Sequence, residues 1–425
     1  MSQSFADRLF PVLPAVIREF GTPFHIYDEA GIRETCRHLN QTLGCVGGFK
    51  EYYAVKALPN PAILRIMRDY RFGFDCSSTM ELELCQSIGA RDNDVMFTSN
   101  NTTVDEFKQA MSLGAIVNLD DVSLVDKVPE PFPELICFRY NPGKLRGGNS
   151  IIGAPHEAKY GIMTSQVVSA YRAARERGAK RFGIHTMICS NQRNYRYMVQ
   201  TVEMLLRICI TLEKELGIRA EFINMGGGIG IPYHPRQRPV DLKRMAAEIR
   251  DCLCIFGSNR GWQPKLFMES GRYMTGPHGV LVSQVINRKE IYQTHIGVDT
   301  GMTGNMCHAM YGAYHHITVL DANGRPANGR RKEVVNIVGP ICENCDRLAT
   351  QRRLPRTKEG DLIVMEDNGA HCIAMGFNYN GRLRPQELLF RSDGVVVRIR
   401  RAETNEDLWR TLYCDQRSEI PIKRE

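Results

Sequence analysis

The fold is decided by a pattern that begins at YYAVKALPNP, residues 52–61. An apolar, strand-like run ends there on a single lysine, Lys56, and the turn formers Pro59, Asn60 and Pro61 follow it. A cation at the end of a buried strand must be paired or desolvated, and desolvation lowers the pKa of the amine and makes it nucleophilic. The alternative is a lysine that reaches from the strand end into water.

Seven more short β-rich runs follow this one, and segments with helical spacing separate most of them. The longest such segment, residues 194–217, should end at Gly217, whereas DVSLVDKV, residues 121–128, is the shortest. Eight strands with intervening helices predict a closed (β/α)8 barrel, and an open doubly wound sheet is the alternative. The expected strands are Tyr52–Lys56, Phe72–Cys76, Val95–Ser99, Ala115–Leu119, Ile136–Asn141, Phe182–Thr186, Phe222–Gly226 and Leu266–Ser270.

The alternation of strand-like and helical segments ends at about Pro277. Short β-rich runs there are separated by turn signals such as DANG, residues 321–324, and RSDG, residues 391–394. We therefore expect a barrel domain over residues 26–278 and a C-terminal β domain over residues 279–425, joined by an N-terminal segment, residues 1–25. The run TPFHIYD, residues 22–28, is a further strand that could pair with the β domain.

Composition restricts the class of protein. The chain of 425 residues is 43% hydrophobic and 24% charged, which is ordinary for a globular protein, and it has neither an apolar run near the ~20 residues of a membrane span nor a signal-peptide pattern. The net charge of +8 indicates a mildly basic surface, because no nucleic-acid motif accompanies it. The 14 cysteines often lie in apolar runs, as Cys137 and Cys209 do, which favours a reducing cytoplasm.

Polar or glycine-rich residues stand at most of the expected strand ends. In barrel enzymes the chemistry lies at the carboxyl ends of the strands, so these residues should converge on one rim. They are Lys56, Asp75, Asn100, Asn101, Asn141, residues 185–190, MGGGIG at residues 225–230, and ESGR at residues 269–272.

The glycine run at residues 226–230 could bring backbone N–H groups close to an anion, and Arg272 could add charge to the same site. A flexible turn is the alternative for the glycines, and an ion pair with Glu269 is the alternative for Arg272. The run does not match a nucleotide P-loop. A lysine, a phosphate cradle and a buried carboxylate together are what pyridoxal phosphate requires.

Six segments carry a resemblance that spans nearly the whole chain: YYAVKALPNPAIL, FGFDCSSTMELEL, INMGGGIGIPY, ESGRYMTGPHGVLVSQV, GPICENCD and YNGRLRPQELL. Together they resemble the alanine-racemase-fold (fold type III) pyridoxal-phosphate decarboxylases, which include the ornithine and diaminopimelate decarboxylases. One difference within these segments is Ser270, which stands where the family has proline.

The resemblance implies pyridoxal phosphate as the cofactor and a role for each matching residue. Lys56 would carry the cofactor as a Schiff base, Glu269 would bind the pyridine nitrogen, and Cys342 would donate a proton near Cα. Cys342 and Glu343 would come from the partner subunit of a head-to-tail homodimer. The implied catalytic residues are Lys56, Cys342 and Glu343; the cofactor-binding residues are Lys56, Asp75, Ser190, Gly227, Gly228, Glu269, Arg272 and Tyr379; the substrate-binding residues are Arg272, Tyr311, Glu343 and Tyr379.

Two further inferences concern acidic groups and metals. Asp75 and Glu81 match acidic positions close to the lysine in the family. CENC, residues 342–345, has the CxxC spacing of metal ligands, but no second CxxC or paired HxxxH completes four ligands, so no metal site is predicted.

Three departures from the family pattern concern the substrate end of the site. Cys307–His308 replaces an arginine–proline pair, although Tyr311 is retained, and cysteine cannot make arginine's bidentate bond to a carboxylate. Met187 stands where a histidine often lies against the cofactor ring, and His371 stands where tyrosine is common. The departures favour a specialised relative, as found in natural-product and antibiotic biosynthesis, the tabtoxin pathway included.

We therefore expect an enzyme that decarboxylates a diamino acid, either diaminopimelate or a modified relative of it. An amino-acid racemase on the same barrel is one alternative, which the GPICENCD segment disfavours. A decarboxylase-like binding protein without activity is another. The expected partners are a small amino-acid substrate and a second copy of the chain, and neither nucleic acid nor a membrane is expected.

Overall fold

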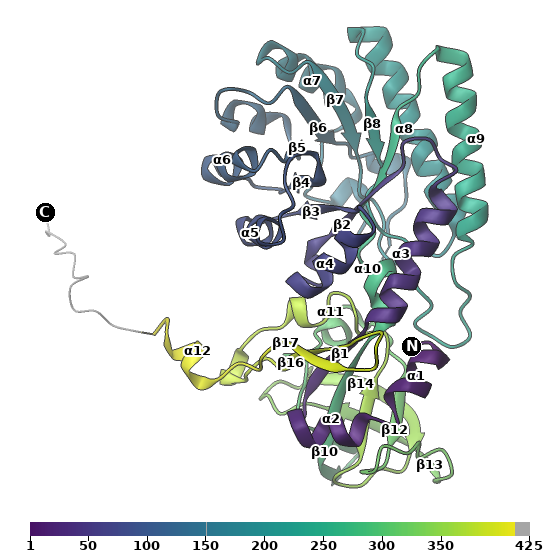
Figure 1. The fold of residues 1–425 in the computed structure, drawn as a ribbon, viewed down its shortest axis with the longest axis vertical. Coiled ribbons are helices and arrows are strands. Elements are labelled where there is room, and N and C mark those ends of the chain that lie inside the picture. Colours follow the sequence, from purple (N-terminus) through teal and green to yellow (C-terminus); the bar gives the residue numbers. More distant parts are fainter. Residues whose placement is uncertain (150, 413–425) are drawn as a thin grey trace, which may run out of the picture.

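Eight parallel strands close into a barrel in the computed structural model, which describes residues 1–149 and 151–412 (Figure 1). The closed barrel confirms the predicted fold and excludes the open sheet. Every expected strand is present, with ends shifted by one or a few residues. The strands are β2 (Lys50–Ala54), β3 (Gly73–Cys76), β4 (Val95–Thr98), β5 (Ile116–Leu119), β6 (Leu135–Arg139), β7 (Arg181–His185), β8 (Phe222–Asn224) and β9 (Lys265–Met268).

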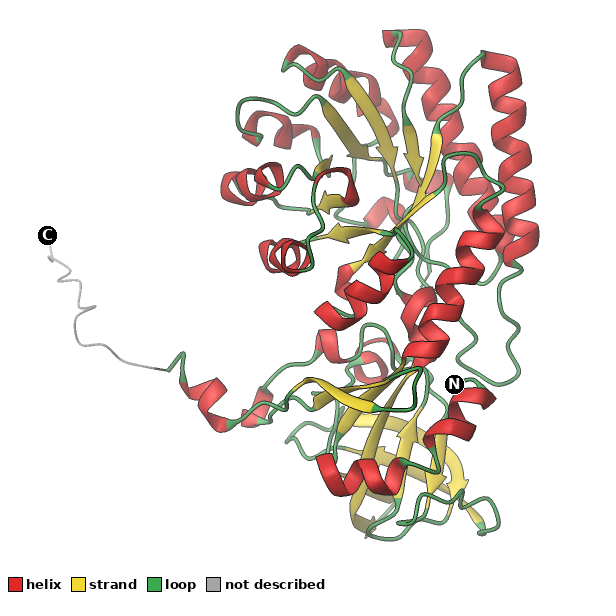
Figure 2. Ribbon diagram, viewed as in Figure 1, coloured by secondary structure: helices red, strands yellow, loops and turns green. Residues whose placement is uncertain are grey.

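Helices surround the barrel (Figure 2). Local sequence sets their ends: Thr103 and Glu106 form a reciprocal capping box at the start of α6, and Gly217 ends α8 in a left-handed conformation with φ of 66°, as expected. The segment DVSLVDKV forms only a 3-10 helix, Val122–Lys127. The barrel helices are α3 (Glu29–Leu43), α4 (Pro61–Asp69), α5 (Thr79–Ser87), α6 (Val104–Ser112), α7 (Val167–Glu176), α8 (Tyr195–Leu216), α9 (Leu242–Arg260) and α10 (Arg272–Thr275).

Large apolar side chains fill one end of the barrel interior. They are Tyr52, Met96, Ile116, Cys137, Phe222 and Phe267, with the Phe222 and Phe267 rings 4.4 Å apart between centroids. Gly183 makes room for this layer, because a Cβ atom there would lie 2.0 Å from the Phe222 ring. The polar residues at the carboxyl ends of the strands therefore occupy the other end of the barrel.

The β domain is a nine-stranded sheet with the order β14-β13-β11-β10-β1-β16-β17, and β15 and β12 extend it from β10. The N-terminal strand β1 (Phe24–Asp28) lies within this sheet, antiparallel to β10 and parallel to β16. The barrel boundary expected at residue 26 therefore falls inside a strand whose partners all belong to the β domain. The other strands are β10 (Gly279–Glu290), β11 (Thr294–Val298), β12 (Ile317–Leu320), β13 (Lys332–Val338), β14 (Arg347–Pro355), β15 (Leu362–Met365), β16 (Gln386–Phe390) and β17 (Val396–Arg400).

Short helices complete the β domain and its junction with the barrel. Helices α1 (Gln3–Leu9) and α2 (Leu13–Phe20) pack their apolar residues on strands β1, β10 and β15. Helix α11 (Cys307–Tyr311) lies on the side of the β domain that faces the barrel, and α12 (Asn405–Trp409) follows β17 (Figure 1). The backbone N–H of His371 donates to the carbonyl of Ala57 at 2.8 Å, which ties a β-domain loop to the end of the first barrel strand.

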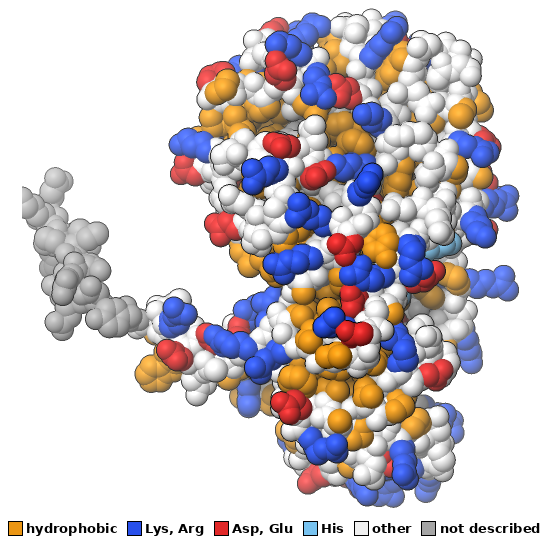
Figure 3. Space-filling view, in the orientation of Figure 1, with side chains coloured by type: hydrophobic (Ala, Val, Ile, Leu, Met, Phe, Trp, Pro, Cys, Tyr) orange, Lys and Arg blue, Asp and Glu red, His pale blue; other side chains and the backbone are white. Residues whose placement is uncertain are grey.

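The surface agrees with a mildly basic globular chain. Lys and Arg side chains alternate with Asp and Glu over the face of both domains shown in Figure 3. Within the part of the chain that the structure describes, no helix combines the length and the apolar character that a membrane span requires.

Candidate active site

A cavity of about 220 Å³ lies at the mouth of the barrel beside the β domain. It brings together seven of the residues predicted from the sequence: Lys56, Ser190, Gly227, Gly228, Glu269, Arg272 and Tyr311. The remaining lining residues are Ala54, Ile151, Ile152, Met187, Gly271, Cys307, His371 and Met375. Its walls come from the carboxyl ends of barrel strands and from two segments of the β domain. The predicted convergence of strand ends on one rim is therefore seen for Lys56, Ser190, Gly227, Gly228, Glu269 and Arg272.

Lys56 lies beyond the strand that was expected to carry it. Strand β2 ends at Ala54, and Lys56 sits in the 3-10 turn Val55–Ala57 that follows it. The side chain is exposed in the cavity, so the expectation that it lies desolvated on a strand is wrong. The amine is thus freely accessible to a molecule in the cavity.

Two carboxyl groups lie close enough to Lys56 to interact with its charge. Asp75 is buried in β3 and does not line the cavity; burial, followed by the charge of Glu269, raises the pKa of its carboxyl, and Lys56 opposes this. Glu81 accepts a hydrogen bond from the Ser77 backbone N–H at 2.6 Å, and burial raises its pKa against the opposing charge of Lys56. Both groups belong to the environment of the lysine, as the resemblance implied.

Glu269 is held by two polar side chains from neighbouring strands. Its carboxylate lies 3.1 Å from His185 Nε2 and accepts a hydrogen bond of 2.7 Å from the Asn224 amide. Burial favours the neutral acid, but the combined effect of His185, Lys56 and Asn224 lowers the pKa of Glu269 below its ordinary value. The group is therefore a buried carboxylate that stays charged. The sequence left open an ion pair between Glu269 and Arg272, but the contacts of Glu269 are with His185 and Asn224 instead.

The glycine run after β8 is packed so closely that side chains are excluded. A Cβ at Gly227 would lie 2.3 Å from the carbonyl oxygen of Glu269, and one at Gly228, whose φ is +95°, would lie 2.5 Å from the carbonyl oxygen of Cys189. These glycines form part of a fixed cavity wall, which argues against the flexible turn. Arg272, which begins α10, lines the same cavity and donates a hydrogen bond to the hydroxyl of Tyr233.

The three departures noted in the sequence all concern this cavity. Cys307, Met187 and His371 line it, whereas both ring nitrogens of His308 turn away, to the Ala313 carbonyl at 2.9 Å and the Thr350 hydroxyl at 3.1 Å. Burial and the positive charges of Arg272 and Lys56 lower the pKa of His371 well below its usual range, so its ring is neutral.

Cys307 lies beside a second buried cysteine. The neighbouring Cys372 thiol, with further contributions from His315 and Arg272, lowers the pKa of the Cys307 thiol to about 5 in spite of its burial. The same interaction raises the pKa of Cys372.

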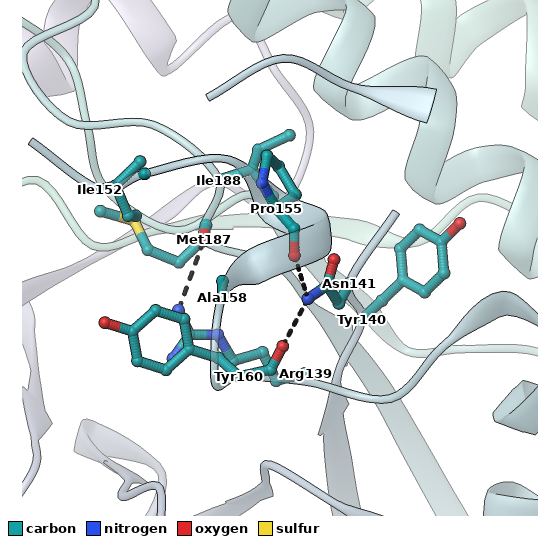
Figure 4. Close-up of a pocket in the computed structure, with 10 residues that line it drawn as sticks. Arg139, Tyr140, Asn141, Ile152, Pro155, Ala158, Tyr160, Met187 and Ile188 are labelled. Carbon is teal, nitrogen blue, oxygen red and sulfur yellow. Dashed lines mark hydrogen bonds between the residues drawn. The ribbon is translucent and has the colours of Figure 1, made fainter. Parts of the chain in front are cut away.

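A smaller cavity adjoins the first one and shares Ile152 and Met187 with it (Figure 4). The Asn141 amide donates to the carbonyls of Pro155 and Tyr160 at 2.9 and 2.7 Å, so this strand-end residue holds a loop in place. Arg139 donates to the Met187 carbonyl at 3.3 Å and thereby supports the segment that carries Met187.

Cys342, Glu343 and Tyr379 lie outside the cavity. All three are exposed on the β domain, and we refer to them as the β-domain cluster. A hydrogen bond with Glu343 raises the pKa of Tyr379, and the Cys342 backbone N–H donates to Asn380 at 2.7 Å. Buried Asp346 fixes the backbone next to Cys342 and Glu343. Its carboxylate accepts hydrogen bonds from the N–H groups of Ile341 at 3.0 Å and Met302 at 2.7 Å. One chain does not bring this cluster to Lys56.

Comparisons with known proteins agree with this geometry. Residues 29–276 match the family model described as the pyridoxal-dependent decarboxylase, pyridoxal binding domain. The chain is 44% identical to Protein TabA of Pseudomonas amygdali pv. tabaci over 96% of its own length and 95% of TabA's. It is 34% identical to the diaminopimelate decarboxylase of Methanothermobacter thermautotrophicus, with 92% of each chain covered. The crystal structure of M. jannaschii diaminopimelate decarboxylase in complex with L-lysine superposes with a TM-score of 0.84 at 27% identity, covering 96% of this chain and 94% of that one.

The chain belongs to the pyridoxal-dependent decarboxylases.

Membership of this family confirms the predicted fold, the cofactor pyridoxal phosphate and the reaction class, a carboxy-lyase. The residues of the cavity fit the cofactor. The accessible Lys56 amine suits its aldehyde, the charged Glu269 carboxylate suits its ring nitrogen, and the close-packed glycines with Arg272 suit its phosphate.

Sequence reasoning missed several residues of this decarboxylase site. His185 was noted only among the strand-end residues and Asn224 was not singled out, yet both fix Glu269. Their position at the ends of β7 and β8, next to β9, was a usable signal, because side chains at the ends of neighbouring barrel strands meet. Cys372 and His315 were not singled out, because no local spacing links them to Cys307.

Proposed function

We propose that the chain decarboxylates a diamino acid in the cavity that contains Lys56. One observation carries the proposal: an accessible lysine amine, a charged buried carboxylate and a glycine wall with an arginine line one cavity of about 220 Å³. When bound, pyridoxal phosphate supplies an electron sink for the pair of electrons that loss of CO2 leaves at Cα.

The cavity residues would divide the work as follows. Lys56 would hold the cofactor through its aldehyde group. Glu269 would keep a proton on the ring nitrogen, because its carboxylate is charged and fixed by His185 and Asn224. Ser190, Gly227, Gly228 and Arg272 would hold the phosphate, and Met187, which lines the same cavity, would lie beside the ring.

The far end of the substrate should lie near Cys307 and Tyr311. Both line the cavity at α11, and Cys307 stands where the resemblance implies the arginine of the diaminopimelate decarboxylases. A cysteine cannot bind a carboxylate with two parallel hydrogen bonds, so we propose a substrate whose distal group differs from the one this arginine would hold. A role in natural-product biosynthesis is consistent with the similarity to TabA.

A homodimer would complete the site. The β-domain cluster is exposed and lies outside the cavity of its own chain, which suits residues that enter the cavity of a second copy. Cys342 would then donate the proton to Cα, and Glu343 and Tyr379 would contact the substrate and the phosphate. We also propose a reducing compartment, the cytoplasm, because the 13 cysteines in the described part of the chain are free.

The test uses purified holoenzyme and a panel of L-, D- and meso-diamino acids, diaminopimelate included, with CO2 as the measured product. Release of CO2 from one of them is expected. No CO2 from any member, together with a change in the chirality of a substrate, would reject the decarboxylase in favour of the racemase.

The role of Lys56 has a separate readout. Borohydride reduction followed by peptide mapping should find the cofactor fixed on Lys56. Lys50→Ala is the matched control, because Lys50 stands at the opposite end of β2 and pairs with Asp94 at 2.7 Å. Cofactor fixed on another lysine, or labelling lost in Lys50→Ala as well, would contradict the assignment.

A further inference from the structure

Three side chains that commonly bind metals meet at the wall of the cavity. The sulfur atoms of Cys307 and Cys372 and a ring nitrogen of His315 all lie within 4.8 Å of one another. All three residues are buried, with exposed fractions of 4%, 1% and 2%. They come from α11, from the segment before β12 and from the segment after β15, so the fold of the β domain, and not a local motif, brings them together.

We propose that Cys307, Cys372 and His315 form a binding site for a thiolate-preferring divalent cation, Zn²⁺ in the first place. Two cysteines and one histidine are the protein ligands of one known class of zinc site, in which a fourth position stays open for water or another molecule. Within residues 1–149 and 151–412, no other three Cys, His, Asp or Glu side chains meet this criterion.

The spacing of the ligand atoms suits a tetrahedral ion. Zn–S and Zn–N bonds of about 2.3 and 2.1 Å at tetrahedral angles place the ligand atoms roughly 3.6–3.8 Å apart. The observed upper limit of 4.8 Å therefore requires each ligand atom to move by less than about 1 Å. Rotation of the cysteine side chains suffices for such a shift.

The histidine has a hydrogen-bond partner for one of its two ring nitrogens. Its Nδ1 lies 2.8 Å from the carbonyl oxygen of Glu366, to which it can donate, and this leaves Nε2 with its lone pair for a metal. The ring also packs edge-on against Tyr233, with 5.0 Å between centroids. Metal-binding histidines are usually held by such a hydrogen bond from the other nitrogen, because it sets both tautomer and ring orientation.

The charges and the access route indicate where a fourth ligand would lie. Two thiolates neutralise a divalent cation, so the bound ion adds no net charge beside Arg272. Of the three ligands only Cys307 lines the cavity, so the open position is on the Cys307 side. A donor group at the distal end of the substrate could bind there. This last step rests on the proposed function, whereas metal binding itself does not.

The experiment measures metal content in the holoenzyme after equilibration with Zn²⁺ and removal of free ion. We expect about one zinc per chain in the wild type and a loss of most of it in Cys372→Ser and in His315→Ala. Cys345→Ala, which removes an exposed cysteine of the CxxC pair, should keep its zinc. Substitution with Co²⁺ should give the ligand-field absorption of a tetrahedral thiolate site, at longer wavelengths than the cofactor absorbs.

Several outcomes would overturn the proposal. These are a metal-free wild type, unchanged zinc in Cys372→Ser, loss of zinc in Cys345→Ala, or a Cys307–Cys372 disulfide in freshly purified protein. Cofactor trapping on Lys56 in each variant shows whether it is folded. Lys56→Ala should retain zinc, so failure of the metal site and failure of the proposed decarboxylase are observed separately.

Discussion

The cavity around Lys56 and the β-domain cluster differ in how completely one chain builds them. In the cavity, Glu269, the glycine wall and Arg272 are held by hydrogen bonds and close packing that the chain supplies itself. In the cluster, Cys342, Glu343 and Tyr379 are exposed, and the contacts of Asp346 and Asn380 are with the backbone N–H groups of the loop that carries Cys342 and Glu343. The difference is what the proposed dimer requires, in which one chain would supply the cavity and its partner the β-domain cluster.

The largest expected effect tests this division directly. Lys56→Ala and Cys342→Ala should each lower CO2 release by on the order of 10³-fold or more, because each removes a group that reacts with cofactor or substrate. When the two inactive variants are mixed and allowed to exchange subunits, part of the activity should return, because a mixed dimer has one site with both residues intact. Activity that stays absent after proven exchange would place both residues in the same chain's site.

A smaller effect is expected at the carboxylate of the cavity. Glu269→Gln should lower kcat by roughly 10²-fold, because a neutral amide cannot hold the proton on the cofactor's ring nitrogen. Glu221→Gln, which alters an exposed pair with Arg181 at the other end of the barrel, should behave as the wild type. Steady-state kinetics with CO2 detection compare the two, and equal losses in both variants would remove the special role of Glu269.

A substitution in the glycine wall, Gly227 and Gly228, should weaken cofactor binding more than it slows the reaction of the bound cofactor. Gly228→Ala should weaken cofactor binding by about tenfold or more, because its Cβ would lie 2.5 Å from a carbonyl oxygen and its φ of +95° is strained for alanine. Gly178→Ala has a similar φ of +110° but open space around it, and therefore controls for backbone strain alone. Titration of the apoenzyme with pyridoxal phosphate measures the cofactor affinity of both glycine variants. Cys342→Ala should bind the cofactor as tightly as the wild type if the β-domain cluster acts in the cavity of the partner chain.

The last prediction concerns the free energy of unfolding and the buried carboxyl group of Glu51. Burial raises the pKa of Glu51 from 4.5 to about 8, although its carboxylate accepts a hydrogen bond from the Ser270 N–H. The folded chain therefore keeps a proton that the unfolded chain releases, and stability decreases as pH rises from about 4.5 to about 8.

Glu51→Gln removes this titration. The variant should gain about 4 kcal/mol relative to the wild type at pH 8, and the gain should shrink towards pH 5. Thermal unfolding across this pH range measures it, with exposed Glu176→Gln as the control. A gain that is constant with pH would exclude Glu51 as the titrating group.

Much of the fold could be predicted from the sequence because buried parallel strands are continuous apolar runs with polar ends. This also explains why Glu269, Gly227, Gly228 and Arg272 were placed correctly beside one cavity. The 3-10 turn at Lys56 was not predicted, since nothing in VKA distinguishes one more strand residue from a tight turn.

The other missed features depend on long-range contacts. His185 touches Glu269 across 84 positions in the sequence. The grouping of Cys307, His315 and Cys372 requires the pairing of β12 with β15, which no local pattern reveals. In the proposed dimer, the β-domain cluster would reach the Lys56 of a second chain. The spacing of residues within one sequence does not reveal a contact between two chains.

The place of β1 in the sheet has a consequence for how the protein is made. Phe24 pairs with Val282 on one side and Gln386 on the other, so this early strand obtains its second neighbour only near the end of synthesis. At about 5–20 residues per second, a ribosome needs roughly 20–70 s to travel that distance, and the barrel can fold in the meantime. Until β16 has been made, the nascent chain thus carries an unpaired strand edge, which is a template for pairing with another chain.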